Sequence, residues 1–182
     1  MPAKPGSVLI QGGIVVTMDR RQRIIKGGSI LVEDGVITKV GGEGLTAGGR
    51  KPERVIHAKG MAVIPGLVDT HIHLAQSLLR GAADDLSLVD WLMKRVWPLQ
   101  ACFTKEDGRV SAELSLLEML KSGTTSFVGV DVVSRYGFDG IADTVERAGL
   151  RGALAKTIMD SPGYGTKGSI MPEGLIEDKQ RA

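Results

Sequence analysis

The stretch that decides the fold of this chain is PGLVDTHIH, residues 65–73. It is a short apolar run that ends in His71 and His73, which are separated by one residue. Successive side chains of a β-strand point to opposite faces, so the two imidazoles and the carboxylate of Asp69 share one face. Zinc readily accepts histidine ligands near neutral pH. The spacing predicts that His71 and His73 bind one metal ion, although two histidines can also share a strand face by chance.

Composition is that of a globular protein and excludes several classes of function. The 182 residues are 42% hydrophobic, and 23 basic and 21 acidic residues give a net charge of +2. No basic stripe with interleaved aromatic residues suggests a nucleic-acid partner. No apolar run approaches the roughly 20 residues that span a bilayer, so we expect no membrane partner. The N-terminal residues do not resemble a signal peptide and Cys102 is the only cysteine, so we expect a cytoplasmic location.

Residues 1–61 have the pattern of a small β domain. Runs rich in Val and Ile alternate with turn-forming residues, at positions 7–10, 13–18, 28–33 and 35–40. Asp34-Gly35 lies between the last two runs and predicts a tight hairpin, because this dipeptide readily adopts positive φ. We expect His57 to be a surface or edge residue of this domain.

From residue 62 to residue 182 the pattern predicts alternating strands and helices, and therefore a parallel sheet with right-handed crossovers. The expected strands are Ala62–Thr70, Thr124–Val130 and Gly152–Met159.

Three helices are expected between and after these strands. They begin at the capping residues Ser87, Thr104 and Asp139 and end at Pro98, Gly123 and Gly149. In the second helix, apolar residues are spaced for one buried face, at Val110, Leu114, Leu117 and Leu120.

Several short segments together resemble one known group of enzymes. The matching runs are IVVTMD at 14–19, ILVEDGVI at 30–37, AKGMAVIPG at 58–66, LLRG at 78–81, DL at 85–86, WL at 91–92, WP at 97–98, Glu118 and SGTT at 122–125. A His-x-His pair alone is a weak motif, but it is specific when it follows Pro-Gly and a β-rich leader. On these residues the chain resembles the amidohydrolase superfamily, in its cytosine deaminase, nucleoside deaminase and triazine hydrolase branch.

The resemblance implies an α/β fold of two parts. Residues 1–61 would be the N-terminal part of a small β-sandwich domain. Residues 62–182 would be an incomplete (β/α)₈ TIM-type barrel that holds the first three strands. Active sites of such barrels lie at the C-terminal ends of the strands, where His71 and His73 fall.

The resemblance also implies a chemistry. Members of this branch are metal-dependent hydrolases of carbon–nitrogen bonds other than peptide bonds. They deaminate a purine, pyrimidine or triazine-like ring through a metal-bound hydroxide, which forms at neutral pH because the metal lowers the pKa of water. The expected metal is zinc, with iron as the alternative. His71 and His73 would share it with a histidine and an aspartate from later strands, and the acid/base residues are expected beyond residue 182.

Three further residues are candidates for binding a small heterocyclic substrate. Gln76 could hydrogen-bond a purine or pyrimidine edge, or be a solvated residue at a helix start. Relatives that act on S-adenosylhomocysteine or methylthioadenosine carry Trp-Pro-x-Glu, whose glutamate binds the ribose hydroxyls, whereas this chain has Gln100 at that position. A neutral amide binds hydroxyls less strongly, which leaves a free base or triazine open. Trp97 could line the pocket or pack the helix.

The chain supplies only part of the implied site. It has three histidines, and about 120 residues follow the β domain whereas a full barrel takes about 250. We therefore interpret it as the N-terminal portion of a longer enzyme. The alternative is a truncated, non-catalytic fragment that forms a homo-oligomer or pairs with a complementary chain.

Overall fold

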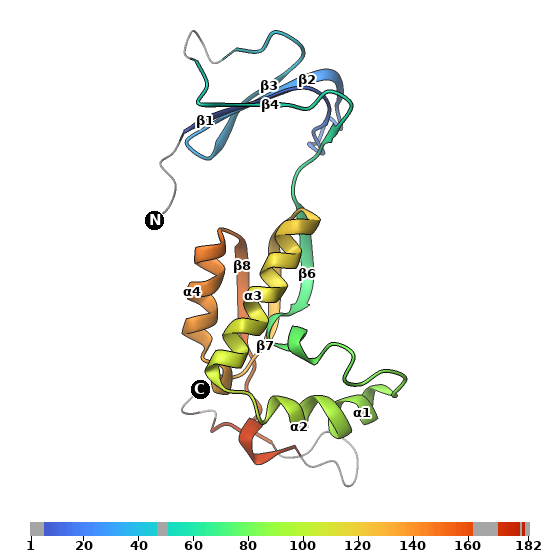
Figure 1. Ribbon diagram of the computed structural model, residues 1–182, viewed down its shortest axis with the longest axis vertical. Helices are drawn as coiled ribbons and strands as arrows, with labels where there is room; N and C mark the ends of the chain where they lie inside the picture. Colours follow the sequence, from blue (N-terminus) through green and yellow to red (C-terminus); the bar gives the residue numbers. More distant parts are fainter. Residues whose placement is uncertain (1–5, 47–50, 162–170, 179, 181–182) are drawn as a thin grey trace. The chain divides into compact units, whose positions relative to one another are not determined.

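The computed structural model describes residues 6–46, 51–161, 171–178 and 180. The chain divides into two compact units, unit 1 (Met1–Pro65) and unit 2 (Gly66–Ala182) (Figure 1). None of the helices in the described part of the chain combines the length and apolar character that crossing a membrane requires.

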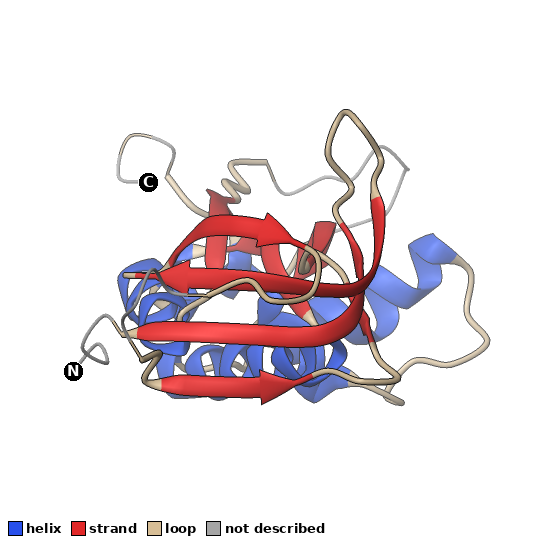
Figure 2. Cartoon of the chain, turned by 90° about the horizontal axis from the view of Figure 1, so that it is seen from above, coloured by secondary structure: helices blue, strands red, loops and turns tan. Residues whose placement is uncertain are grey.

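Unit 1 consists of strands and turns in its described residues. Its strands are β1 (Ser7–Val16), β2 (Ile24–Glu33), β3 (Val36–Gly41), β4 (Arg54–His57) and β5 (Ala62–Val63). They form one sheet in the order β3-β2-β1-β4, in which β5 also pairs with β1. The first three strands are antiparallel, and β4 and β5 run parallel to β1 (Figure 2).

Turn chemistry in unit 1 follows the sequence closely. Asp34 and Gly35 have φ values of 52° and 76° and join β2 to β3, which confirms the predicted hairpin. The two runs predicted at 7–10 and 13–18 form one strand, because β1 continues through Gly12-Gly13 with a shift in its pairing with β2.

Unit 2 contains a sheet of three parallel strands. They are β6 (Leu67–His73), β7 (Thr124–Val132) and β8 (Arg151–Lys156), in the order β6-β7-β8. The predicted parallel sheet is confirmed. The prediction of a single strand over Ala62–Thr70 is wrong, because β5 pairs with β1 of unit 1 and a new strand begins at Leu67. Pro65 has no N–H for a strand ladder, and it falls between the two.

The helical segments of unit 2 connect and flank these strands. They are η1 (Leu74–Leu79), α1 (Leu88–Trp91), η2 (Leu92–Val96), α2 (Trp97–Gln100), α3 (Lys105–Ser122), η3 (Ser134–Tyr136), α4 (Phe138–Ala148) and η4 (Glu173–Leu175). Of these, η2 is a π-helical turn and the other η segments are 3₁₀ helices. Helices α3 and α4 lie side by side, and they contact β7 and β8 respectively (Figure 1).

Caps explain where α3 begins and ends. The Thr104 side chain accepts a hydrogen bond from the backbone N–H of Asp107, whose carboxylate accepts one from the Thr104 N–H, so the capping box is complete. The Thr104 hydroxyl and the Thr104 backbone N–H both donate to the Asp107 carboxylate and hold the pKa of Asp107 below its ordinary value. Gly123 ends the helix in the left-handed conformation, with φ of 85°. Both predicted ends of this helix are confirmed.

Two predicted helix ends are wrong. Pro98 lies in the first turn of α2 and does not end the helical run, since a π-helical turn precedes it and the first turn tolerates a missing N–H. Gly137, rather than Asp139, is the N-cap of α4.

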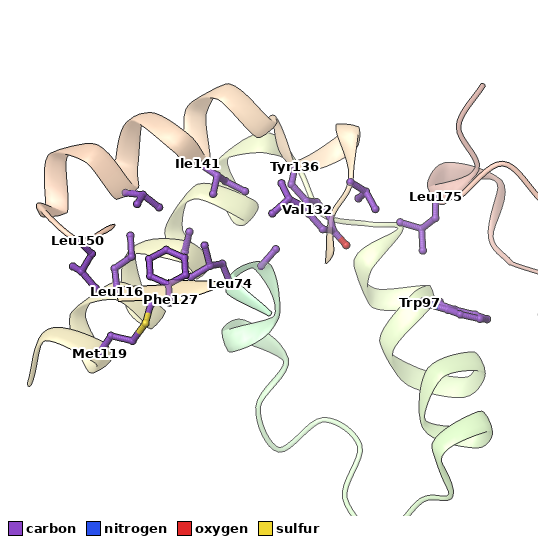
Figure 3. Packing of buried hydrophobic residues seen from close by; sticks show 14 of the residues in the cluster. Leu74, Trp97, Leu116, Met119, Phe127, Val132, Tyr136, Ile141, Leu150 and Leu175 are labelled. Atoms are coloured by element: carbon purple, nitrogen blue, oxygen red, sulfur yellow. The ribbon is translucent and has the colours of Figure 1, made fainter. Parts of the chain in front are cut away.

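The core of unit 2 lies between the sheet and its helices. Figure 3 shows Phe127 of β7 beside Leu74 of η1 and Leu116 of α3, with Ile141 of α4 above them. Leu74 and Ile141 are completely buried. The segment directly after the His-x-His strand is therefore anchored in the core.

Helix α3 buries a different face from the one predicted. Its buried residues are Gly108, Ser111, Ala112, Ser115, Leu116 and Met119. Val110, Leu117 and Leu120, which the spacing predicted to be buried, are 37%, 54% and 48% exposed. The prediction is wrong because Ser111 and Ser115 bond to Leu74 of η1 and Gly108 lies against Tyr136 of η3, so the buried face combines these small residues with Leu116 and Met119.

Candidate metal and substrate site

The His-x-His pair lies at the C-terminal end of β6. The Nε2 atoms of His71 and His73 are 3.0 Å apart, and the ring centroids are separated by 5.0 Å with an angle of 50° between the rings. The two imidazoles thus direct one nitrogen each toward a common point, as their strand spacing predicted. His71 is exposed and His73 is half-buried.

The strand is irregular next to this pair. Its register with β7 shifts between Asp69 and Ile72, which marks a bulge in the ladder. Bulges occur next to active sites, where they change the direction of a side chain. The Asp69 carboxylate accepts a hydrogen bond of 3.1 Å from the backbone N–H of His71. Asp69 therefore braces the backbone that carries the first histidine.

A cavity of about 560 Å³ opens beside the strand. Its walls come from β6, η1, the following loop, α1, η2, α3 and the start of β7, and they include Asp69, His73, Gln76, Arg80, Asp84, Trp91, Ser115 and Glu118. Polar groups from four segments therefore converge on a space that one of the two histidines reaches.

One ion pair ties the loop of this cavity to α3. Arg80 donates two parallel hydrogen bonds of 2.8 Å to the two carboxylate oxygens of Glu118. The guanidinium holds the pKa of Glu118 below its ordinary value, and the carboxylate raises the pKa of Arg80. Because both side chains are largely exposed, the pair adds little to stability and mainly fixes geometry.

The predicted substrate residues are only partly brought together. Gln76 lines the cavity with His73, as does Trp91. Trp97 is 4% exposed and belongs to the core cluster, and Gln100 is 1% exposed. Neither is among the residues that line this cavity, so their contact with a substrate stays a prediction.

His57 lies apart from the pair, in unit 1. It is the last residue of β4, is exposed, and contacts the side-chain amide of Gln11 at 3.1 Å. Its predicted surface position is confirmed. In the described part of the chain, no cluster of three or more His, Cys, Asp or Glu side chains could hold a metal ion, so His71 and His73 form a pair without a third such ligand there.

Comparison with models of protein families identifies the family of the chain. Residues 62–181 match the amidohydrolase family. The chain belongs to this family. The resemblance of the short motifs is thereby confirmed.

The chain is also similar to curated proteins of known activity. The 5-methylthioadenosine/S-adenosylhomocysteine deaminases of Bacillus cereus strain 03BB102 and Bacillus thuringiensis strain Al Hakam are each 43% identical over 159 residues. In each case the match covers 84% of this chain and 34% of the relative, so the chain spans about a third of their length. These relatives are deaminases, and they do not favour a non-catalytic fragment.

Solved structures of the superfamily are similar over nearly the whole chain. An adenosine deaminase from Xanthomonas campestris with bound zinc is 29% identical with a TM-score of 0.78, covering 96% of this chain and 38% of that one. An atrazine chlorohydrolase from Arthrobacter aurescens TC1, complexed with zinc, is 24% identical with a TM-score of 0.78, covering 96% and 40%. The second likeness concerns the fold alone. Both confirm the α/β class predicted from the sequence.

Sequence reasoning missed the contacts that support the site. Arg80 and Glu118 were recognised as separate motif residues, but their pairing across 38 positions was not predicted. The serines at 111 and 115 are not among the residues predicted for the site, although two small hydroxyl residues one helical turn apart can face the same neighbour. That spacing is the signal that could have found them.

Proposed function

We propose that the chain is the N-terminal part of a metal-dependent hydrolase that deaminates a nitrogen heterocycle. The observation that carries the proposal is the 3.0 Å separation of the His71 and His73 Nε2 atoms at the C-terminal end of a parallel strand. Membership of the amidohydrolase family and the deaminase relatives support it. The bond cleaved is a carbon–nitrogen bond of a purine, pyrimidine or triazine-like ring.

The histidine geometry fits a divalent metal ion. Two nitrogens that each lie about 2.0–2.1 Å from one zinc ion are separated by roughly 2.8–3.4 Å when the N–Zn–N angle is between 90° and the tetrahedral value. The observed spacing of 3.0 Å falls within that range. His71 and His73 would hold the ion as neutral imidazoles. A divalent ion supplies a bound water with a lowered pKa. The zinc bound in the similar adenosine deaminase structure favours zinc over iron.

The likeness to the zinc-bound adenosine deaminase also supports a proposal for the architecture of a longer protein. We propose that β6, β7 and β8 are the first three strands of a (β/α)₈ barrel. The strands of unit 1 would belong to a β-sandwich, with the division near the predicted boundary of residues 1–61 and 62–182. Parallel order, helical crossovers and the likeness to the zinc-bound deaminase support this arrangement.

The chain's own residues would bind and orient the substrate beside the ion. The Gln76 amide has both donors and acceptors for the edge of a heterocycle, and it lines the same cavity as His73. Arg80 and Glu118 form part of the same wall and keep it in place. Gln100 and Trp97 are buried, so any contact they make with a substrate would require the helical segment to move.

The test uses the full gene product that contains these residues. Ammonia release is measured on methylthioadenosine, S-adenosylhomocysteine, adenosine, guanine, cytosine and a triazine, before and after metal removal by a chelator. We expect activity on at least one ring, loss on chelation and recovery with zinc. His71→Ala and His73→Ala should each remove nearly all activity and bound metal, while His57→Ala, the matched control in unit 1, should be close to neutral.

Two results would contradict the proposal. One is full activity in the variant that lacks both His71 and His73. The other is equal zinc content in wild type and in that variant, since the metal would then be held elsewhere.

A further inference from the structure

The peptide bond between Leu74 and Ala75, one residue beyond His73, is held by two buried serines of α3. The Leu74 carbonyl accepts hydrogen bonds from the Ser111 hydroxyl at 3.2 Å and from the Ser115 hydroxyl at 3.3 Å. Leu74 and Ser111 are completely buried, and Ser115 is 6% exposed. Two donors one helical turn apart thus converge on one backbone oxygen, directly after the second histidine.

A second set of contacts extends this attachment along η1. The Ser77 hydroxyl donates to the Ser111 carbonyl at 2.6 Å, and the Leu78 N–H donates to the Ser111 hydroxyl at 3.4 Å. Residues 74, 77 and 78 are therefore all fixed to one position of α3. Gln76, which lines the cavity, lies between these anchored residues.

These serines are unusual choices for a buried helix face. A serine in a helix commonly bonds to the carbonyl one turn before it or to water. Burial requires that each hydroxyl has a partner, so a serine that points into the core restricts the neighbouring backbone to positions that supply one. An alanine or leucine would bury apolar surface without fixing the direction of the Leu74 carbonyl. The hydroxyls thus specify orientation in a way that apolar packing does not.

We propose that Ser111 and Ser115 are positioning residues for the metal pair. By holding the Leu74 carbonyl, they fix the backbone of His73 and so the direction of its imidazole relative to that of His71. The inference rests on the proposed function, because it assumes that the pair binds a metal ion. Groups that orient a ligand typically change metal affinity when they are removed.

The test compares Ser111→Ala/Ser115→Ala with wild type in the full gene product. Zinc affinity is measured by competition with a chromophoric chelator, and we expect it to fall about tenfold. Amide hydrogen exchange over residues 72–76 of the metal-free protein should become faster. The matched control is Thr144→Val, which removes a buried hydroxyl that donates to the Gly140 carbonyl of its own helix, α4, at 2.8 Å. It should change neither quantity.

The outcomes separate this inference from the function on which it rests. If His71→Ala abolishes zinc binding but the double serine variant keeps wild-type affinity and exchange, the positioning role is wrong and the function stands. If His71→Ala leaves zinc binding unchanged, the proposed function fails first. An equal loss of affinity in Thr144→Val would show a general effect of destabilisation and would overturn the inference. Should the double variant not fold, the single variants Ser111→Ala and Ser115→Ala each have to show a smaller loss of affinity.

Discussion

The two faces of α3 differ in composition in a way that hydrophobicity alone would not predict. The buried face carries small and hydroxyl residues beside Leu116 and Met119, whereas Val110, Leu117 and Leu120 lie on an exposed face. Both sets recur at helical spacing. Periodicity therefore identifies candidate buried faces of a helix, while close approach and hydrogen bonding decide which face meets the core.

The buried face is specific in what it contacts. A Cβ added at Gly108 would lie 2.7 Å from the Cβ of Tyr136, so only glycine allows this approach. Ser111 and Ser115 bond to the Leu74 carbonyl. Leucine side chains at these positions would separate the helix from Tyr136 and from Leu74, the residue that follows His73.

The largest expected effect concerns zinc. The buried face of α3 would position the histidines, but neither face of this helix would add a metal ligand. The 182-residue chain alone should therefore bind zinc weakly, in the micromolar range or weaker. His71 and His73 supply two of the roughly four ligands that a zinc site needs. Isothermal titration measures this. Tight one-to-one binding that disappears in either histidine-to-alanine variant would reveal a further ligand set and would contradict the prediction.

A substitution on the buried face tests the comparison directly. Gly108→Leu should lower the free energy of unfolding by about 3 kcal/mol, because the new side chain overlaps Tyr136 and its backbone. Leu117→Gln, on the opposite face of the same helix, should change it by less than about 0.5 kcal/mol. Urea denaturation of the full gene product measures both. Similar losses in the two variants would mean that the faces are not distinguished as the structure has them.

The fold was predictable where local chemistry dominates. The Asp34-Gly35 hairpin, the Thr104 capping box and the parallel order of the strands are confirmed, because each depends on a few adjacent residues or on simple alternation. The histidine pair was predictable for the same reason, since strand spacing alone brings the two rings together.

The wrong or missing predictions concern features that depend on contacts between residues far apart in the sequence. The buried face of α3 depends on Leu74 of η1, 37 positions before Ser111, whose carbonyl accepts the hydrogen bond of the serine hydroxyl. The short strand β5 pairs with β1, which lies far earlier in the sequence, and strand propensity does not reveal that partner. The Arg80–Glu118 pair likewise joins two motif segments across the cavity.

The exposed face predicts self-association. Leu117 and Leu120 leave an apolar row uncovered in the described structure, and β6 and β8 are the outer strands of the sheet in unit 2. Such rows and edges recruit other chains. The 182-residue chain should therefore sediment as oligomers at low micromolar concentration, and Leu117→Lys/Leu120→Lys should shift it toward monomer. A single sharp species near 19.3 kDa with cooperative melting would contradict this. Oligomers that the double variant leaves unchanged would assign association to the sheet edges.

The smallest expected effect concerns the ion pair between α3 and the cavity loop. Arg80 lowers the pKa of Glu118 below its ordinary value of 4.5. A carboxyl group whose pKa is lowered by folding contributes stability above its unfolded pKa and loses it as the pH falls through the folded value. Glu118→Gln should therefore melt slightly below wild type at about pH 6, and the difference should shrink toward about pH 3.

The partner residue provides the control for this pH dependence. Arg80→Gln removes the guanidinium that lowers the pKa of Glu118, so it should also melt slightly below wild type near neutral pH and approach it in acid. Both side chains are exposed, at 64% and 47%, so solvent screening keeps the shift small and added salt should reduce it further. A constant difference in melting temperature across the pH range would mean that the two variants act through lost packing of their long side chains. The ion pair would then have no measurable part in holding the loop of the cavity against α3.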